Sequence, residues 1–139
     1  MKMGKPELVR LEVFKDSLGE LSVLEFPFPA KRLYFFDKVL EATKRGFHAH
    51  KTLQQIFLVL QGSVTITCST PIIEYRFELN SQDSNALLLP PGYWRILENF
   101  ELKTICLVMA SETYNESDYI RDWNEYENWF IKNVSIHES

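Results

Sequence analysis

Short runs in which apolar and polar residues alternate fill most of the 139-residue chain. A period of two is typical of β-strands that bury one face. Turn-forming segments, such as Asp16–Gly19 and Pro90–Gly92, separate the runs. Many short strands with turns between them predict an all-β sandwich or barrel. The expected strands cover residues 8–14, 21–26, 31–36, 54–61, 64–68, 72–79, 86–89 and 102–110.

Near the C-terminus the period changes. Apolar residues recur there at helical spacing, at Tyr119, Ile120, Trp123, Tyr126 and Phe130. We expect an α-helix with Ser117 as its N-cap and Asp118 in its first turn, where a carboxylate complements the helix dipole. The aromatic face of this helix would cover one side of the barrel or contact a partner.

Composition and charge place the chain among globular proteins, with 45% hydrophobic residues and a formal net charge of -4. Its length suits one core, so we expect residues 1–139 to form a single domain. The negative charge favours neither nucleic acid nor an anionic membrane, and we expect neither as a partner.

The N-terminal segment and the cysteines predict the compartment. Residues 1–6 precede no long apolar stretch, so they do not resemble a signal peptide, and no run is apolar enough to span a membrane. Cys68 and Cys106, the two cysteines, fall inside apolar runs, which favours buried free thiols over a disulfide. We therefore expect a cytoplasmic protein.

Candidate chemistry begins with two histidines, His48 and His50, in the segment Gly46–His50. On a strand these side chains share a face, and in a barrel that face is often the interior. With an unperturbed pKa of about 6.5, histidine can accept and return a proton near neutral pH. A pair of buried structural histidines is the alternative.

The spacing around these histidines resembles the first cupin motif, with Gln55 at the position of the usual glutamate. Pro90–Gly92 and Arg95 resemble the second motif, with Arg95 at the position of the usual histidine. Glutamine is a weak neutral ligand and arginine stays protonated, so two histidines alone would hold a divalent ion loosely. The resemblance implies a cupin, that is a double-stranded β-helix (jelly-roll) barrel with a C-terminal α-helix, and we expect it to hold no metal.

A more specific resemblance runs from about residue 14 to residue 130. The segments Lys31–Phe36, Arg45–Lys51 and Ala110–Arg121 are similar to the nucleotide-sugar 3,4-ketoisomerases, which are metal-free cupins of deoxysugar biosynthesis. This resemblance implies conversion of dTDP-4-keto-6-deoxyglucose to a dTDP-3-keto-6-deoxyhexose through an enediol(ate), with no cofactor. The product would lead to 3-amino-3,6-dideoxy sugars of surface polysaccharides such as lipopolysaccharide.

The same resemblance implies roles for catalytic residues. His50 would be the base, while His48 and Tyr34 would orient it, shuttle a proton or stabilise the enolate oxygen. For Tyr34, a core aromatic with a satisfied hydroxyl is an open alternative.

Further residues are expected to bind the substrate. Arginine forks match phosphate oxygens, which makes basic side chains candidates for the diphosphate or the sugar, and for each of them a surface salt bridge is the alternative. These candidates are Arg32, Arg45 and Lys51. Gln55, Arg95 and Leu18 complete the expected substrate-binding set. Relatives vary at the positions of Leu18 and Arg95, which leaves the gluco or galacto configuration of the product open.

Other interpretations of the chain are a 3,5-epimerase acting on the same substrate and a non-catalytic sugar-binding cupin. A metal-dependent dioxygenase is disfavoured by Gln55 and Arg95. We expect a homodimer, because small cupins commonly pair through sheet edges, which covers exposed strand hydrogen-bonding groups.

Overall fold

The computed structural model describes residues 1–134, most of which lie in short antiparallel strands. The N-terminal strands are β1 (Glu7–Arg10), β2 (Glu12–Asp16), β3 (Gly19–Val23) and β4 (Arg32–Phe36). The following strands are β5 (Arg45–His50), β6 (Gln55–Gln61), β7 (Ser63–Ser69), β8 (Glu74–Asn80), β9 (Asn85–Leu89), β10 (Trp94–Glu98) and β11 (Ile105–Ala110). The 3₁₀ turn η1 (Glu116–Asp118), strand β12 (Tyr119–Ile120) and helix α1 (Trp123–Asn133) end the described part.

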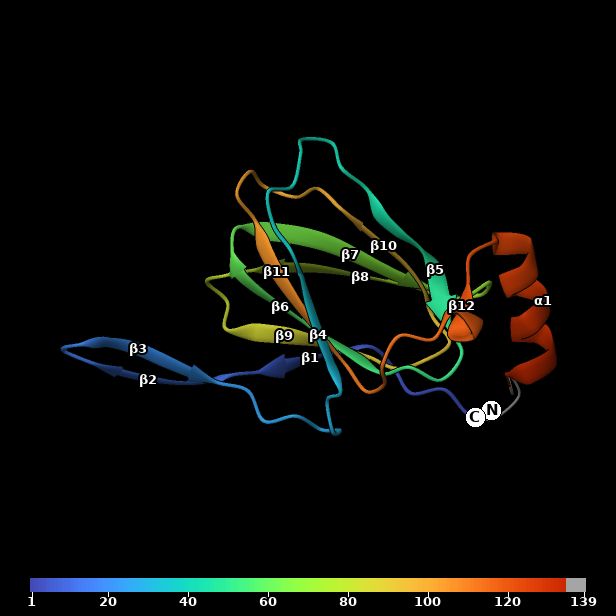
Figure 1. The fold of residues 1–139 in the computed structure, drawn as a ribbon, viewed down its shortest axis with the longest axis horizontal. Helices are drawn as coiled ribbons and strands as arrows, with labels where there is room; N and C mark the ends of the chain where they lie inside the picture. The colour runs from blue at the N-terminus through green and yellow to red at the C-terminus, as the bar shows by residue number, and fades with distance from the viewer. Residues whose placement is uncertain (135–139) are drawn as a thin grey trace.

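Two five-stranded sheets form the barrel in residues 1–134, as Figure 1 shows. Their strand orders are β1-β9-β6-β11-β4 and β12-β5-β10-β7-β8, and neighbouring strands pair antiparallel. The chain crosses repeatedly from one sheet to the other, for example from β5 to β6 and from β9 to β10. This arrangement is a jelly roll, and it confirms the predicted all-β cupin barrel with a C-terminal α-helix.

The main core lies between the two sheets. Phe57 of β6 and Ile66 of β7 are buried in one apolar cluster, together with Leu87 of β9. Cys68 and Cys106 lie in the same cluster as free thiols, which confirms the prediction. Burial raises the pKa of each thiol to about 12, so both stay protonated at neutral pH.

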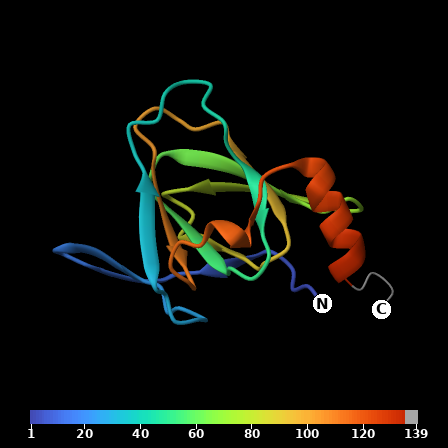
Figure 2. The same cartoon turned by 45° about the vertical axis from the view of Figure 1, so that its right-hand side comes forward.

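Helix α1 covers the outer face of β5, at the end of the molecule opposite the β2–β3 hairpin (Figures 1 and 2). Its Tyr126 and Phe130 are buried in a cluster with Ala49 of β5. Ala49 lies between the two histidines in sequence, so the strand turns Ala49 to the helix and His48 and His50 to the other side. No helix in the described part of the chain is long and apolar enough to cross a membrane.

The sequence prediction placed the start of the helix too early. Helix α1 begins at Trp123, and the N-cap Asp122 accepts a hydrogen bond from the Glu125 N–H at 2.9 Å. Ser117 and Asp118 belong to η1, while Tyr119–Ile120 pairs with β5 as strand β12. Pairing with the barrel therefore outweighs the helical spacing of the first aromatic residues.

Some strand boundaries also differ from the prediction. The expected strand 8–14 is broken at buried Leu11, where the chain leaves the barrel for the β2–β3 hairpin. The strands expected to start at residues 72 and 102 begin at Glu74 and Ile105. Strand β10 was not expected, because the buried Arg95 interrupts its apolar pattern.

Candidate active site

His48 and His50 lie side by side, as predicted. Their ring centroids are 4.9 Å apart and the ring planes are perpendicular. His50 is almost fully buried, whereas His48 is partly exposed. The two imidazoles therefore form one cluster on the side of β5 that faces away from α1.

Gly46 lets the histidine strand approach β10 closely. A Cβ atom at this position would lie 2.6 Å from the Arg95 carbonyl oxygen, and the backbone there has a φ of +100° that favours glycine. The carbonyl of Gly46 lies 3.0 Å from Nδ1 of His48. A carbonyl can only accept, so Nδ1 of His48 carries the hydrogen and Nε2 carries the lone pair.

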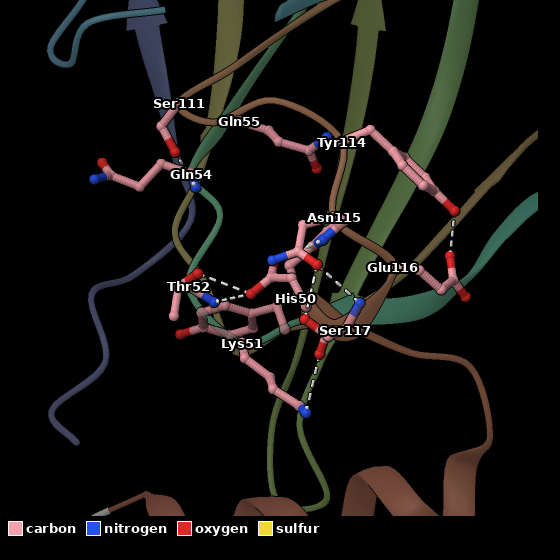
Figure 3. A network of polar contacts seen from close by, with 12 residues as sticks. His50, Lys51, Thr52, Gln54, Gln55, Ser111, Tyr114, Asn115, Glu116 and Ser117 are labelled. Carbon is pink, nitrogen blue, oxygen red and sulfur yellow. Dashed lines mark hydrogen bonds and ion pairs between the residues drawn. The ribbon is translucent and has the colours of Figure 1, made fainter. Parts of the chain in front are cut away.

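His50 contacts a carboxylate from a distant part of the chain. Its Nδ1 lies 3.1 Å from Oδ2 of Asp118. Oδ1 of Asp118 accepts from the Thr52 N–H at 2.9 Å and from the Thr52 hydroxyl at 2.8 Å. Figure 3 shows His50 and Thr52 close together, with Lys51 extending to Ser117. Nε2 of His50 is buried and has no hydrogen-bond partner.

A chain of hydrogen bonds joins Arg95, Gln55 and Tyr34. Nη1 of Arg95 donates to Oε1 of Gln55, and Nε2 of Gln55 donates to the Tyr34 hydroxyl at 2.9 Å. Because Tyr34 accepts here, its own hydroxyl hydrogen remains available to another acceptor. Burial raises the pKa of Tyr34, so the phenol stays protonated and acts as a donor at neutral pH.

Arg95 is a buried cation, only 2% exposed. Its Nη2 lies 3.4 Å from the Tyr93 carbonyl, and its Nε has no partner. The ion pairs of residues 1–134 do not include Arg95. The barrel thus holds a positive charge that forms no ion pair within the described residues, which is costly unless a ligand supplies negative charge.

The site keeps both histidines neutral. Burial, followed by the positive charge of Arg95, lowers the pKa of His48 to about 4 and that of His50 to about 2. Both imidazoles therefore carry a free lone pair at neutral pH, which a general base requires.

A cavity of about 260 Å³ opens beside these groups and is lined by His48, Tyr34 and Arg95. Exposed and partly buried cations surround it, namely Arg32, Arg45 and Arg121. A neighbouring cavity of about 200 Å³ contains His50 and Asp118, and Arg32 and Tyr119 line both cavities. Two larger surface hollows, of about 710 and 1040 Å³, contain no histidine and lie elsewhere.

The structure brings most of the predicted site residues together. The two histidines meet edge to face, and Tyr34, Gln55 and Arg95 form the hydrogen-bonded chain described above. His48, Tyr34 and Arg95 line the same cavity. Arg32 and Arg45 line the cavity, where their guanidinium groups lie 4.8 Å and 4.9 Å from the ring centroids of Tyr34 and Phe36.

Leu18 and Lys51 line neither of these two cavities, and their expected roles near the substrate stay predictions. Leu18 is 94% exposed at the tip of the β2–β3 hairpin, which projects away from the barrel of its own chain (Figure 1). The Lys51 ammonium donates to the Ser117 carbonyl at 3.1 Å, so it fastens η1 to the end of β5 and does not line either cavity.

Sequence reasoning missed Asp118, Tyr119 and Arg121 as site residues. It assigned the first two to a helix, but strand β12 sets Tyr119 opposite His50, with 4.3 Å between the ring centroids. The Arg121 guanidinium lies 4.2 Å from the Tyr119 ring centroid and pairs with Glu116 at 2.8 and 2.9 Å. The sequence D-x-x-E at Asp122–Glu125 is a helix-start signal that could have corrected the assignment.

The donor set does not fit the metal site of many cupins. Residues 1–134 contain no group of three or more His, Cys, Asp or Glu side chains that could hold a metal ion. Gln55 and Arg95 occupy the positions of the other two metal ligands of those cupins, and the Arg95 guanidinium donates to the neutral amide of Gln55. A protonated guanidinium cannot coordinate a cation, so we derive no step through a metal.

Comparisons with known proteins agree with this geometry. Residues 4–130 match the family model described as FdtA: WxcM-like, C-terminal. The TDP-4-oxo-6-deoxy-alpha-D-glucose-3,4-oxoisomerase of Aneurinibacillus thermoaerophilus is 30% identical over 130 residues, which cover 91% of this chain and 93% of that protein.

Solved structures give the same picture. A variant of the 3,4-ketoisomerase QdtA from Thermoanaerobacterium thermosaccharolyticum, in complex with TDP-4-keto-6-deoxyglucose, is 35% identical with a TM-score of 0.87, covering 96% of this chain and 97% of that one. The dTDP-4-dehydrorhamnose 3,5-epimerase of Bacillus anthracis is 16% identical with a TM-score of 0.72, covering 82% of this chain and 76% of that one, and shares the fold alone. The chain therefore belongs to the FdtA family (WxcM-like, C-terminal), together with these sugar 3,4-ketoisomerases, and it is an isomerase.

Proposed function

We propose that this chain is a dTDP-sugar 3,4-ketoisomerase that converts dTDP-4-keto-6-deoxyglucose to a dTDP-3-keto-6-deoxyhexose by histidine-mediated proton transfer. One observation carries the proposal: the same barrel contains a neutral, buried His50 and a buried Arg95 that forms no ion pair. The relatives named for the same type of isomerisation support the choice of substrate.

The reaction moves a proton between adjacent carbons. The 4-ketone acidifies the hydrogen on carbon 3, and Nε2 of His50 removes it. The electrons of the broken C–H bond form a double bond between carbons 3 and 4, and oxygen 4 takes the negative charge. Carbon 4 then receives a proton, the hydroxyl proton of oxygen 3 is transferred to oxygen 4, and the carbonyl forms at carbon 3. Atoms and electrons balance without an oxidant or reductant.

Arg95 and Tyr34 stabilise the enediolate that this sequence produces. Arg95 supplies a fixed positive charge inside the barrel, where burial weakens the screening by water. The Tyr34 hydroxyl, which already accepts from Gln55, has its hydrogen free for an enolate oxygen. His48, with its lone pair on Nε2, exchanges protons with the sugar oxygens.

Cations around the cavity would hold the diphosphate of the nucleotide. Arg32 and Arg45 line the same cavity as His48, and guanidinium groups bind phosphate oxygens through paired hydrogen bonds. The product would then lead to 3-amino-3,6-dideoxy sugars of surface polysaccharides. In this proposal residues 1–139 act as one cupin domain, and the cytoplasmic location expected from the sequence stays a prediction.

We further propose that the protein works as a homodimer. Strand β4 is an edge of its sheet, and its Leu33 and Phe35 are more than half exposed. Exposed apolar side chains on an unpaired edge favour association with a second copy.

One experiment tests the proposed reaction. Chelator-treated protein is incubated with dTDP-4-keto-6-deoxyglucose in deuterated water, and the sugar protons are followed by NMR. A ketoisomerase moves the carbonyl to carbon 3 and places solvent deuterium on carbon 4. Exchange at carbons 3 and 5 with retention of the 4-ketone would instead identify a 3,5-epimerase. Binding without exchange, or activity only with added iron and oxygen, would also contradict the proposal.

A further inference from the structure

Asp118 reaches the site from an element far from β5 in sequence, yet its position is closely fixed. Its Oδ1 atom accepts from both the N–H and the hydroxyl of Thr52, at 2.9 and 2.8 Å. The Lys51 N–H donates to the Asp118 carbonyl at 3.0 Å, and the next residue, Tyr119, pairs with His50 in the β12–β5 ladder. The carboxylate is therefore attached to the strand that carries the histidine, and its other oxygen, Oδ2, faces Nδ1 of His50 at 3.1 Å.

This contact selects one form of the neutral imidazole. A carboxylate can only accept, so the hydrogen bond forms when Nδ1 of His50 carries the hydrogen. The other tautomer would set the lone pair of Nδ1 against the carboxylate at 3.1 Å, in a nearly dry site where such repulsion is strong. With the hydrogen on Nδ1, the lone pair lies on Nε2, which is the buried atom without a partner.

We propose that Asp118 is a positioning residue that fixes His50 as the Nδ1–H tautomer, so that Nε2 is available to remove the substrate proton. The inference rests on the proposed function, because it takes His50 as the base. It adds a residue to which the sequence resemblance gave no role.

Asp118 also offsets the charge that appears during the reaction. When Nε2 accepts a proton, His50 becomes a buried imidazolium that Arg95 and His48 disfavour. The Asp118 carboxylate, whose side chain is 13% exposed, is the acidic partner in direct contact with this ring in residues 1–134. A carboxylate behind the imidazole holds its orientation and stabilises the cation that forms, without itself taking the proton.

The variant Asp118→Asn separates this role from packing, because an asparagine has nearly the same shape. Its amide can donate to Nδ1, which would reverse the tautomer and place the hydrogen on Nε2. We expect kcat to fall by about 10²-fold or more, with KM changed by less than about 3-fold. Thr52→Val, which removes one of the two bonds to Oδ1, should lower kcat by only about 3- to 10-fold.

The matched control is Asp122→Asn, the same substitution four residues along the chain. Asp122 caps α1 and accepts from the Glu125 N–H, and an asparagine oxygen accepts the same bond, so this variant should keep both its fold and its turnover. Asp118→Glu keeps the charge and should retain more activity than Asp118→Asn.

The test combines kinetics with long-range ¹H–¹⁵N NMR of ¹⁵N-histidine-labelled protein, in which the His50 signals are identified by their loss in His50→Asn. The proposal predicts a protonated Nδ1 and a bare Nε2 in the wild-type protein, and the reverse in Asp118→Asn. A wild-type His50 with its hydrogen on Nε2 would overturn it. So would an Asp118→Asn variant that keeps kcat, or that loses kcat while His50 keeps its tautomer. The tautomer is read without substrate, so a wild-type protein that fails to isomerise the keto sugar would contradict the proposed function alone.

Discussion

The guanidinium of Arg95 donates a hydrogen bond to the amide oxygen of Gln55 inside the barrel. These are the two positions at which the cupin motifs usually carry a histidine and a glutamate ligand. The pair leaves a permanent positive charge beside His48, since neither residue neutralises it. This charge keeps the histidines unprotonated, and in the proposed reaction it also stabilises the enediolate.

Replacement of Arg95 should separate activity from stability. Arg95→Met removes a buried charge that has no acidic partner, so the free energy of unfolding should stay equal or rise by up to about 2 kcal/mol. Turnover should fall by about 10²- to 10³-fold, because the enediolate loses its cation. Urea unfolding and steady-state kinetics measure both effects, and Arg76→Met, at an exposed position of β8, is the control. A stable variant with full activity would remove Arg95 from the mechanism.

Gln55→Glu tests the need for an unneutralised cation with little change in shape. The new carboxylate would pair with Arg95 and cancel its charge. We expect kcat to fall by about 10²-fold and the pKa of His48 and His50 to rise, because the repulsion from Arg95 is offset. NMR titration of the histidines reports the second effect, and unchanged histidine titration would argue against this electrostatic link.

Stability should depend on pH through the same histidines. The pKa of His48 is about 4 in the folded protein and about 6.5 in an unfolded chain, so between these values the unfolded state binds more protons. The contribution of the neutral His48 to the free energy of unfolding is complete above about pH 6.5 and is lost as the pH falls toward about 4. Compared with the wild type, His48→Asn should show a slope of unfolding free energy against pH that is lower by up to about 1.4 kcal/mol per pH unit. Identical slopes from pH 4.5 to 6.5 would contradict the assigned pKa.

The exposed edge strand predicts an association that is sensitive to charge. We expect the wild type to be a dimer by light scattering and Phe35→Asp, on β4, to shift it toward monomer. Leu102→Asp introduces the same charge at an exposed turn and should leave the mass unchanged. A monomeric wild type, or equal masses for all three proteins, would contradict the proposed homodimer.

The sequence predicted the parts of the site that depend on local spacing. Alternation along one strand was enough to place His48 and His50 on one face, and residues with motif spacing, Gln55 and Arg95, meet in the barrel. The link from Gln55 to Tyr34 could not be predicted, because it depends on the register of β6, β11 and β4.

The contact between Asp118 and His50 could not be predicted for a different reason. Asp118 is 68 residues from His50 and comes just before apolar residues with helical spacing, which favoured a helix over a strand that pairs with β5. The course of the β2–β3 hairpin could not be predicted either, because a turn signal predicts a hairpin but not the direction in which the hairpin leaves the barrel.

In the proposed reaction, the free lone pair on Nε2 of the buried His50 accepts the proton from carbon 3 of the sugar. Parallel measurement of turnover and of nucleotide-sugar binding by His50→Asn tests it most directly, with calorimetry for the binding. We predict that turnover falls by more than about 10³-fold while the Kd changes by less than about 3-fold, because the basic residues that hold the diphosphate are untouched. Turnover equal to that of the wild type would contradict the claim and would move the base to His48 or Tyr34.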